Sequence, residues 1–166
     1  MELIVRSSTL VHKMRWCLLG CLILLPAWAH AQVVREMRTS VMKGPQLVMS
    51  DSRIVSLGRA VRPEDVLIAT NHSAAMWAER EPNGAVSRVF VLQGKRTREV
   101  QCYPRVRDYW FVGSGALIGL DCGGLHFAGK EILLTTASFK KIDEFDQAIV
   151  PPESRPSWSS SGEGEK

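Results

Sequence analysis

The stretch from Val86 to Phe139 constrains the fold more than any other part of the chain. Short runs rich in Val, Ile, Leu, Phe, Tyr and Thr alternate there with breaks that contain glycine. This pattern is typical of successive antiparallel strands joined by tight turns. We therefore expect strands at residues 86–92, 98–103, 109–112, 116–121, 125–127 and 131–138.

The segments before residue 86 fit more than one type of structure. Apolar residues recur at every fourth position over Val33–Met42, which suits either a short helix or a strand. Residues 46–49 and 53–57 flank Ser50-Asp51-Ser52 and predict a hairpin, because Asp and Ser stabilise turns. Pro63 favours the start of a helix, and residues 66–70 would continue that helix or form a buried strand.

Residues 73–81 and 140–147 are the hardest segments to assign. The first is rich in alanine, which favours helix, but Pro82-Asn83-Gly84 behind it is a hairpin signal. We prefer a strand for 73–81 and expect one helical turn within 140–147. The complete pattern predicts a mainly β domain of roughly six to nine strands, a small antiparallel sandwich or partly open barrel, with one or two short helices.

The first 31 residues have the pattern of a secretory signal peptide. Lys13 and Arg15 precede an apolar run over residues 16–25, and Pro26 ends that run. Small residues follow at both positions that signal peptidase recognises in Ala29-His30-Ala31. We therefore expect cleavage after Ala31 and a periplasmic or secreted protein with no transmembrane span after processing.

Two alternatives exist for this leader. Translation that starts at Met14 would still produce a complete signal. Leu18-Leu19-Gly20-Cys21 resembles the lipobox of bacterial lipoproteins, which predicts a lipid anchor on Cys21. That alternative leaves only residues 16–20 as the apolar core, so cleavage after Ala31 is preferred.

Export determines how the cysteines are interpreted. Cys17 and Cys21 leave with the leader, so Cys102 and Cys122 remain. An isolated pair in an oxidising compartment usually forms a disulfide. Two thiols are also fewer than the four ligands of a structural zinc site, so we expect one disulfide and no metal.

Processing would leave 135 residues, with 18 Lys and Arg against 16 Asp and Glu. This near balance gives no support for nucleic-acid binding. We expect a single globular domain over residues 32–150. Residues 151–166 are rich in Pro, Ser, Gly and Glu, a composition typical of a disordered tail.

Positive charge is concentrated between Arg80 and Arg107, where the sequence contains seven Lys and Arg but only two acidic residues, Glu81 and Glu99. We expect part of this group to form one positive patch, with Tyr103 or Trp110 close enough to stack on a ligand. The alternative is a solubilising sheet edge, because charged side chains discourage pairing with other strands. The candidate binding residues are Lys95, Arg96, Arg98, Arg105, Arg107 and Trp110.

Catalytic chemistry has weaker support. His126 would serve as a base, with Asp121 as its orienting acid and Ser73 or Ser114 as nucleophile. However, Gly-x-Ser-x-Gly is absent from the sequence, and a histidine between Leu125 and Phe127 is typical of a half-buried strand position.

Other ligand motifs are weak as well. The acidic run over residues 143–146 lacks the spacing of a calcium loop. Gly123-Gly124 indicates a close backbone approach rather than a phosphate loop. We expect no cofactor.

The sequence therefore predicts an exported, non-catalytic accessory or binding protein that contacts a protein partner or an anionic envelope component. One alternative is an inhibitor or immunity-type protein that blocks a partner's active site with a loop at residues 105–108 or 113–115. The other is a small envelope hydrolase that uses His126.

Cleavage after Ala31 is directly testable. N-terminal sequencing of the exported protein is expected to begin at Gln32. A lipid-modified N-terminus at Cys21 would contradict this prediction and place the protein on a membrane.

Overall fold

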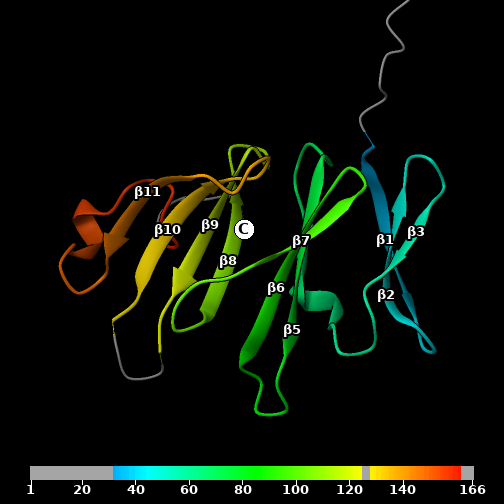
Figure 1. Cartoon of the computed structure of the whole chain (residues 1–166), viewed down its shortest axis with the longest axis horizontal. Coiled ribbons are helices and arrows are strands. Elements are labelled where there is room, and N and C mark those ends of the chain that lie inside the picture. The colour runs from blue at the N-terminus through cyan, green and yellow to red at the C-terminus, as the bar shows by residue number, and fades with distance from the viewer. Residues whose placement is uncertain (1–31, 125–127, 162–166) are drawn as a thin grey trace, which may run out of the picture. The chain divides into compact units, whose positions relative to one another are not determined.

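A computed structural model describes residues 32–124 and 128–161, and within them it contains eleven strands in three antiparallel sheets (Figure 1). Each sheet is built from strands that follow one another in the chain. The first sheet contains β1 (Val34–Ser40), β2 (Gly44–Met49) and β3 (Ile54–Ser56). The middle sheet contains β4 (Val66–Ile68), β5 (Ala74–Arg80), β6 (Val86–Gln93) and β7 (Arg96–Val100). The last sheet contains β8 (Val106–Val112), β9 (Leu117–Cys122), β10 (Lys130–Thr135) and β11 (Lys141–Asp146).

The middle sheet is covered on both faces. Ala74, Met76 and Ala78 of β5 belong to a core shared with apolar residues of the last sheet. Ala75 and Trp77, which alternate with them, belong to a second core shared with the first sheet. Successive side chains of a strand point to opposite faces, so β5 lies between two cores and its first five residues are all buried.

This double burial confirms the strand predicted for residues 73–81. Helix propensity favours alanine, but it is a weak preference that tertiary packing overrides. The small side chains of Ala74, Ala75 and Ala78 leave room for a sheet on each side. The mainly β class, the antiparallel sheets and the hairpin around Asp51 are confirmed as well.

Three expectations before residue 86 are resolved or corrected. Residues 34–40 are a strand paired with β2 rather than a helix. The helix expected after Arg62 is only a 3-10 turn over Pro63–Asp65, and Val66 of β4 then pairs with Trp77 of β5. The strand count exceeds the six to nine predicted, because β1, β4 and β11 are strands where the sequence also allowed or favoured helix.

The helical turn expected within residues 140–147 is wrong. These residues form β11, in which Phe145 pairs with Glu131 of β10 and is buried. Pairing with β10 satisfies the backbone of β11 and places one large aromatic side chain in the core. The strand predicted at 125–127 lies outside the described residues.

Residues 151–161 differ from the disordered tail that their composition predicts, while 162–166 lie outside the described residues. A 3-10 turn spans Pro152–Ser154, and Ser159 is only 1% exposed. The backbone N–H and the hydroxyl of Ser160 donate to the carboxylate of Glu131, at 2.8 and 2.7 Å. Glu131 is fully buried, and a buried carboxylate needs such donors.

The predicted disulfide between Cys102 and Cys122 is present, with 5.8 Å between the two Cα atoms. Cys102 lies in the link from β7 to β8, whereas Cys122 ends β9. The disulfide therefore links the segment between β7 and β8 to strand β9 of the last sheet.

A group of hydrogen bonds and an ion pair also connects the middle and last sheets. Asp65, which is buried, accepts two hydrogen bonds from Arg80, one of them 2.8 Å from Nε. The hydroxyl of Tyr109 in β8 donates to the carbonyl oxygen of Asp65. Burial, together with the Asp65 carboxylate, raises the pKa of Tyr109 above its ordinary value.

Loss of the disulfide is expected to destabilise the domain. The bond closes a loop with a sequence separation of 20 residues, worth about 3 kcal/mol in the chain-entropy model. Replacing both Cys102 and Cys122 with alanine should lower the melting temperature by roughly 10 °C. Detection of two reactive thiols in the unfolded, non-reduced wild-type protein would contradict the bond.

The raised pKa of Tyr109 predicts a pH dependence. The folded state holds the phenolic proton more tightly than the unfolded state. The protonated side chain of Tyr109 therefore contributes fully to the free energy of unfolding below about pH 10, and this contribution is lost as the pH rises above that value. Urea unfolding at pH 8 and about pH 11 should show a smaller loss of stability in Tyr109→Phe than in wild type. Tyr103→Phe is the matched control, since Tyr103 is 93% exposed. Equal losses in wild type and Tyr109→Phe would contradict the prediction.

Candidate functional site

The hairpin of β6 and β7 presents the cations that the sequence predicts as binding residues. Gln93 and Arg96 are the last paired residues, which leaves Gly94 and Lys95 as a two-residue turn. Gly94 has a φ of 58°, as a type II′ turn requires at its first central position. The guanidinium of Arg53 donates to the carbonyl oxygen of Gly94 at 2.8 Å and so holds the tip against the first sheet.

Arg96 and Arg98 lie on the same face of β7, because residues two apart in a strand point to one side. That face also carries Val100, which belongs to the core shared with the last sheet. Arg96 and Arg98 therefore extend the same face beyond the apolar core, where both are exposed.

A cavity of about 110 Å³ lies beside these two arginines, and we call it the hairpin cavity. The hairpin contributes Val91, Gln93, Arg96 and Arg98, and the turn between β10 and β11 contributes Phe139 and Thr136. The Arg98 guanidinium carbon lies 5.4 Å from the centre of the Phe139 ring, a cation–π distance. The cavity thus combines positive charge with an aromatic wall.

The turn that carries Phe139 is tightly hydrogen-bonded. Phe139 has a φ of 58° and its N–H donates to the carbonyl oxygen of Thr135 at 2.8 Å. The hydroxyl of the buried Thr136 donates to the carbonyl oxygen of Gly115, also at 2.8 Å. These bonds fix the aromatic wall relative to the last sheet.

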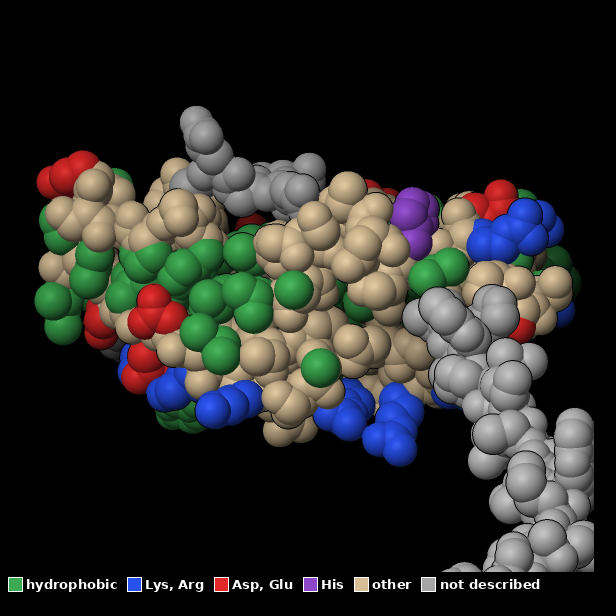
Figure 2. All heavy atoms as spheres, turned by 90° about the horizontal axis from the view of Figure 1, so that it is seen from above, with side chains coloured by type: hydrophobic (Ala, Val, Ile, Leu, Met, Phe, Trp, Pro, Cys, Tyr) green, Lys and Arg blue, Asp and Glu red, His purple; other side chains and the backbone are tan. Residues whose placement is uncertain are grey.

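No acidic side chain in the described part of the chain pairs with Lys95, Arg96 or Arg98. By contrast, Arg80 pairs with Asp65 and Arg88 with Glu79. Lys and Arg side chains gather along one edge of the face shown in Figure 2. Cations without an acidic partner in the same chain keep their charge available for a ligand.

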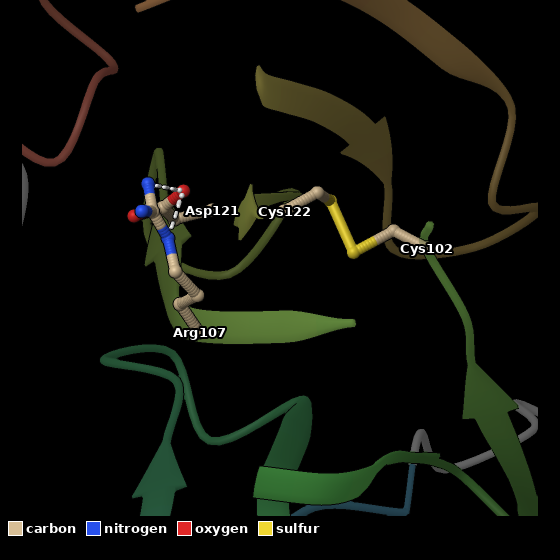
Figure 3. Close-up of a disulfide and its surroundings, with 4 residues drawn as sticks. All are labelled: Cys102, Arg107, Asp121 and Cys122. Atoms are coloured by element: carbon tan, nitrogen blue, oxygen red, sulfur yellow. Dashed lines mark hydrogen bonds and ion pairs between the residues drawn. A yellow bond between two sulfur atoms is a disulfide. The ribbon is translucent and has the colours of Figure 1, made fainter. Parts of the chain in front are cut away.

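Arg107 is not part of this group. It donates to Asp121 from Nε at 3.1 Å and from Nη2 at 2.7 Å, next to the disulfide (Figure 3). Its Nη2 also donates to the side chain of Gln147 at 2.6 Å. A Cβ on Gly129 would lie 2.1 Å from that nitrogen, so a side chain at position 129 would displace the guanidinium from this place. The positive charge of Arg107 is therefore neutralised locally.

Arg105 lies apart from Arg96. It lines a different cavity, of about 280 Å³, together with Ser87, Arg88 and Glu99. Arg96 begins β7 and Val100 ends it, a span of about 13 Å for a strand. The candidates therefore divide between the hairpin tip and the far end of β7, and the single patch expected from the sequence is not formed.

Trp110 is also placed differently from the prediction. It is 3% exposed, and its Nε1 donates to the carbonyl oxygen of Trp158 at 2.8 Å. A Cβ on Gly119 would lie 2.1 Å from the ring, so the indole packs directly against Gly119 of the neighbouring strand β9. Trp110 therefore anchors the C-terminal segment, and Tyr103 is the exposed aromatic residue of this region.

The residues named for a hydrolase are separated or otherwise bonded. His126 lies outside the described residues. Asp121 accepts from Arg107 near the end of β9, whereas Ser114 precedes the start of that strand. The strand between them is about 13 Å long. The side chain of Asn71 accepts a hydrogen bond from the N–H of Ser73 and packs near Gly115, which places Ser73 at the Ser114 end.

The loops named for an inhibitor are short. Val106, Arg107 and Asp108 belong to β8 rather than to a loop. A Cβ on Gly115 would lie 2.3 Å from that of Ala69, so the turn at 113–115 packs closely against the residue that follows β4.

Gln93, Thr136 and Phe139 belong to the site although the sequence did not single them out. Phe139 directly follows the strand predicted at 131–138, and it approaches Arg98 only through the packing of two sheets. No local pattern in the sequence signals this approach.

Within the described residues, no three His, Cys, Asp or Glu side chains are grouped as metal ligands. No helix in this part of the chain has the length and apolar character to cross a membrane.

Comparisons of the chain with protein-family models, with curated proteins and with solved structures each return no match.

Proposed function

We propose that this protein is an exported, non-catalytic binding protein that recognises an anionic partner through Arg96 and Arg98. The observation that carries the proposal is the pair of guanidinium groups without an acidic partner on one face of β7, beside a cavity whose wall includes Phe139. Lys95 at the turn adds a third positive charge. Arg105, Arg107 and Trp110 are not included, because the first is distant and the other two have internal partners.

The rigidity of the hairpin supports binding at this place. Arg53 holds the tip at Gly94, and hydrogen bonds hold the turn that carries Phe139. A preorganised site loses less conformational entropy when it binds a ligand. The arginines therefore stand on a fixed support, although their own side chains are exposed.

Export is supported by two independent features. The leader has the pattern of a secretory signal. The Cys102–Cys122 bond suits an oxidising compartment such as the periplasm or the extracellular space.

Charge reversal of the two arginines is expected to weaken binding to a carboxylate polymer. The probe is fluorescent poly-L-glutamate, measured by anisotropy at about 20 mM and about 200 mM salt, because exposed charge interactions are screened by salt. Each exposed charge pair contributes about 0.2–1 kcal/mol. Arg96→Glu with Arg98→Glu should therefore lower affinity at low salt by about tenfold, with an unchanged circular dichroism spectrum.

The matched control is Arg35→Glu with Lys43→Glu, an exposed cation of β1 and one of the turn between β1 and β2. This variant has the same net charge as the first and should bind within about twofold of wild type. Equal losses in the two variants would show that only net charge matters, and would contradict a local site at β7.

A further inference from the structure

The strand β7 forms a free edge of the middle sheet. The strand order is β4-β5-β6-β7, so β7 has a partner on one side only. Its residues 96–99 are all exposed. Apart from its ladder to β6, no backbone group of β7 hydrogen-bonds to the backbone of any other described residue.

The register shows which backbone groups are free. Gln93 and Arg96 close a two-residue hairpin and therefore form a hydrogen-bonded pair. Hydrogen-bonded and non-hydrogen-bonded pairs then alternate along an antiparallel ladder. The N–H and C=O of Thr97 and Glu99 consequently point away from β6, toward the place of a fifth strand.

The charge on this edge selects its partner. In an antiparallel pair, directly opposite residues share a face of the sheet. A strand added to β7 would place its own side chains opposite Arg96 and Arg98. Two copies of β7 would bring like charges together, which is unfavourable. An acidic strand would instead gain from both arginines.

The other edge strands lack this combination. β1 uses its first N–H, on Val34, to bond to the carbonyl oxygen of His72, and its Arg38 pairs with Glu36. β3 and β4 have three residues each. Among the edge strands of the described residues, β7 carries two exposed arginines without acidic partners on one face, whereas β1 carries one such cation, Arg35.

Resting on the proposed function, we propose that β7 binds an acidic segment of a partner protein as an added antiparallel strand. The carboxylates of the added strand lie opposite Arg96 and Arg98, and the hairpin cavity receives one of these side chains. Main-chain hydrogen bonds to Thr97 and Glu99 supply affinity, as in other cases of strand addition.

The occupant is a different protein rather than β11 of a second copy. β11 is acidic, but its Glu144 already contacts Lys130 and Lys141. The carboxylate of Asp143 accepts from Trp158 at 3.1 Å. These acids are therefore satisfied within their own chain.

The test uses the blocked peptide acetyl-TETETET-amide and its uncharged counterpart acetyl-TQTQTQT-amide. Binding to the full mature protein is measured by calorimetry at low salt. The acidic peptide is expected to bind at least tenfold more tightly than the uncharged one, and Arg96→Glu with Arg98→Glu should remove this difference. Equal binding of both peptides would overturn the proposal.

Backbone methylation separates strand addition from attraction by charge alone. With glutamates opposite the arginines, the threonine N–H groups of the peptide face β7 and the glutamate N–H groups face solvent. Methylation of the threonine nitrogens should therefore weaken binding at least tenfold, and methylation of the glutamate nitrogens should not. If the threonine-methylated peptide binds like its parent, strand addition is overturned. The proposed function then still stands if Arg96→Glu with Arg98→Glu weakens binding.

A protein variant supplies a second measurement. Thr97→Pro removes an outward N–H without touching the arginines, and proline is tolerated at sheet edges when its nitrogen faces solvent. This variant should lose at least tenfold in affinity for the acidic peptide, whereas Thr97→Val should bind like wild type. Wild-type affinity in a folded Thr97→Pro variant would overturn strand addition. Concentration-dependent sedimentation of the wild-type protein without peptide would instead show a second copy as the occupant, and would overturn the proposal of a foreign partner.

Discussion

Burial of the middle sheet on both faces is the constraint on which the other features depend. Ala74, Met76 and Ala78 pack toward the last sheet, while Ala75 and Trp77 pack toward the first. Burial of apolar surface is the dominant favourable contribution to folding, and β5 contributes to two cores at once. The hydrogen bond from Tyr109 to Asp65 then ties the last sheet to the segment that precedes β4, and the disulfide ties the segment between β7 and β8 to β9. Because each sheet is formed by consecutive strands, one end of the middle sheet, β7, remains an edge.

That edge is positioned by the same packing. Val100 is buried in the core between the middle and last sheets, so the alternate residues Arg98 and Arg96 leave the core on the same face. The last sheet brings Phe139 beside them. The β6–β7 hairpin thus has a rigid base and a charged, exposed end. Positive charge at such an edge opposes pairing with a like strand and favours an acidic one.

Much of the fold follows from local sequence. Alternating apolar residues and Gly94 predict the β6–β7 hairpin, and export predicts the cysteine pairing. The patterns fail where distant segments decide the structure. β11 forms because β10 is available to pair, and residues 158–160 are ordered because the buried Glu131 needs donors. Likewise, the sequence predicts Arg107 as an exposed cation that is available to a ligand. In the fold its guanidinium instead donates hydrogen bonds to Asp121 and Gln147. Arg96 and Arg98 were predicted, whereas Phe139 becomes their neighbour only through sheet packing.

Amide hydrogen exchange, followed residue by residue, tests most directly whether the free edge of β7 is the binding surface. In the free protein, the amide of Arg98 should be protected by its bond to β6, whereas the amides of Thr97 and Glu99 should exchange rapidly. Addition of acetyl-TETETET-amide at saturating concentration should slow exchange at Thr97 and Glu99 and leave Arg98 nearly unchanged. Saturation of the protein with no added protection at Thr97 and Glu99 would contradict the account.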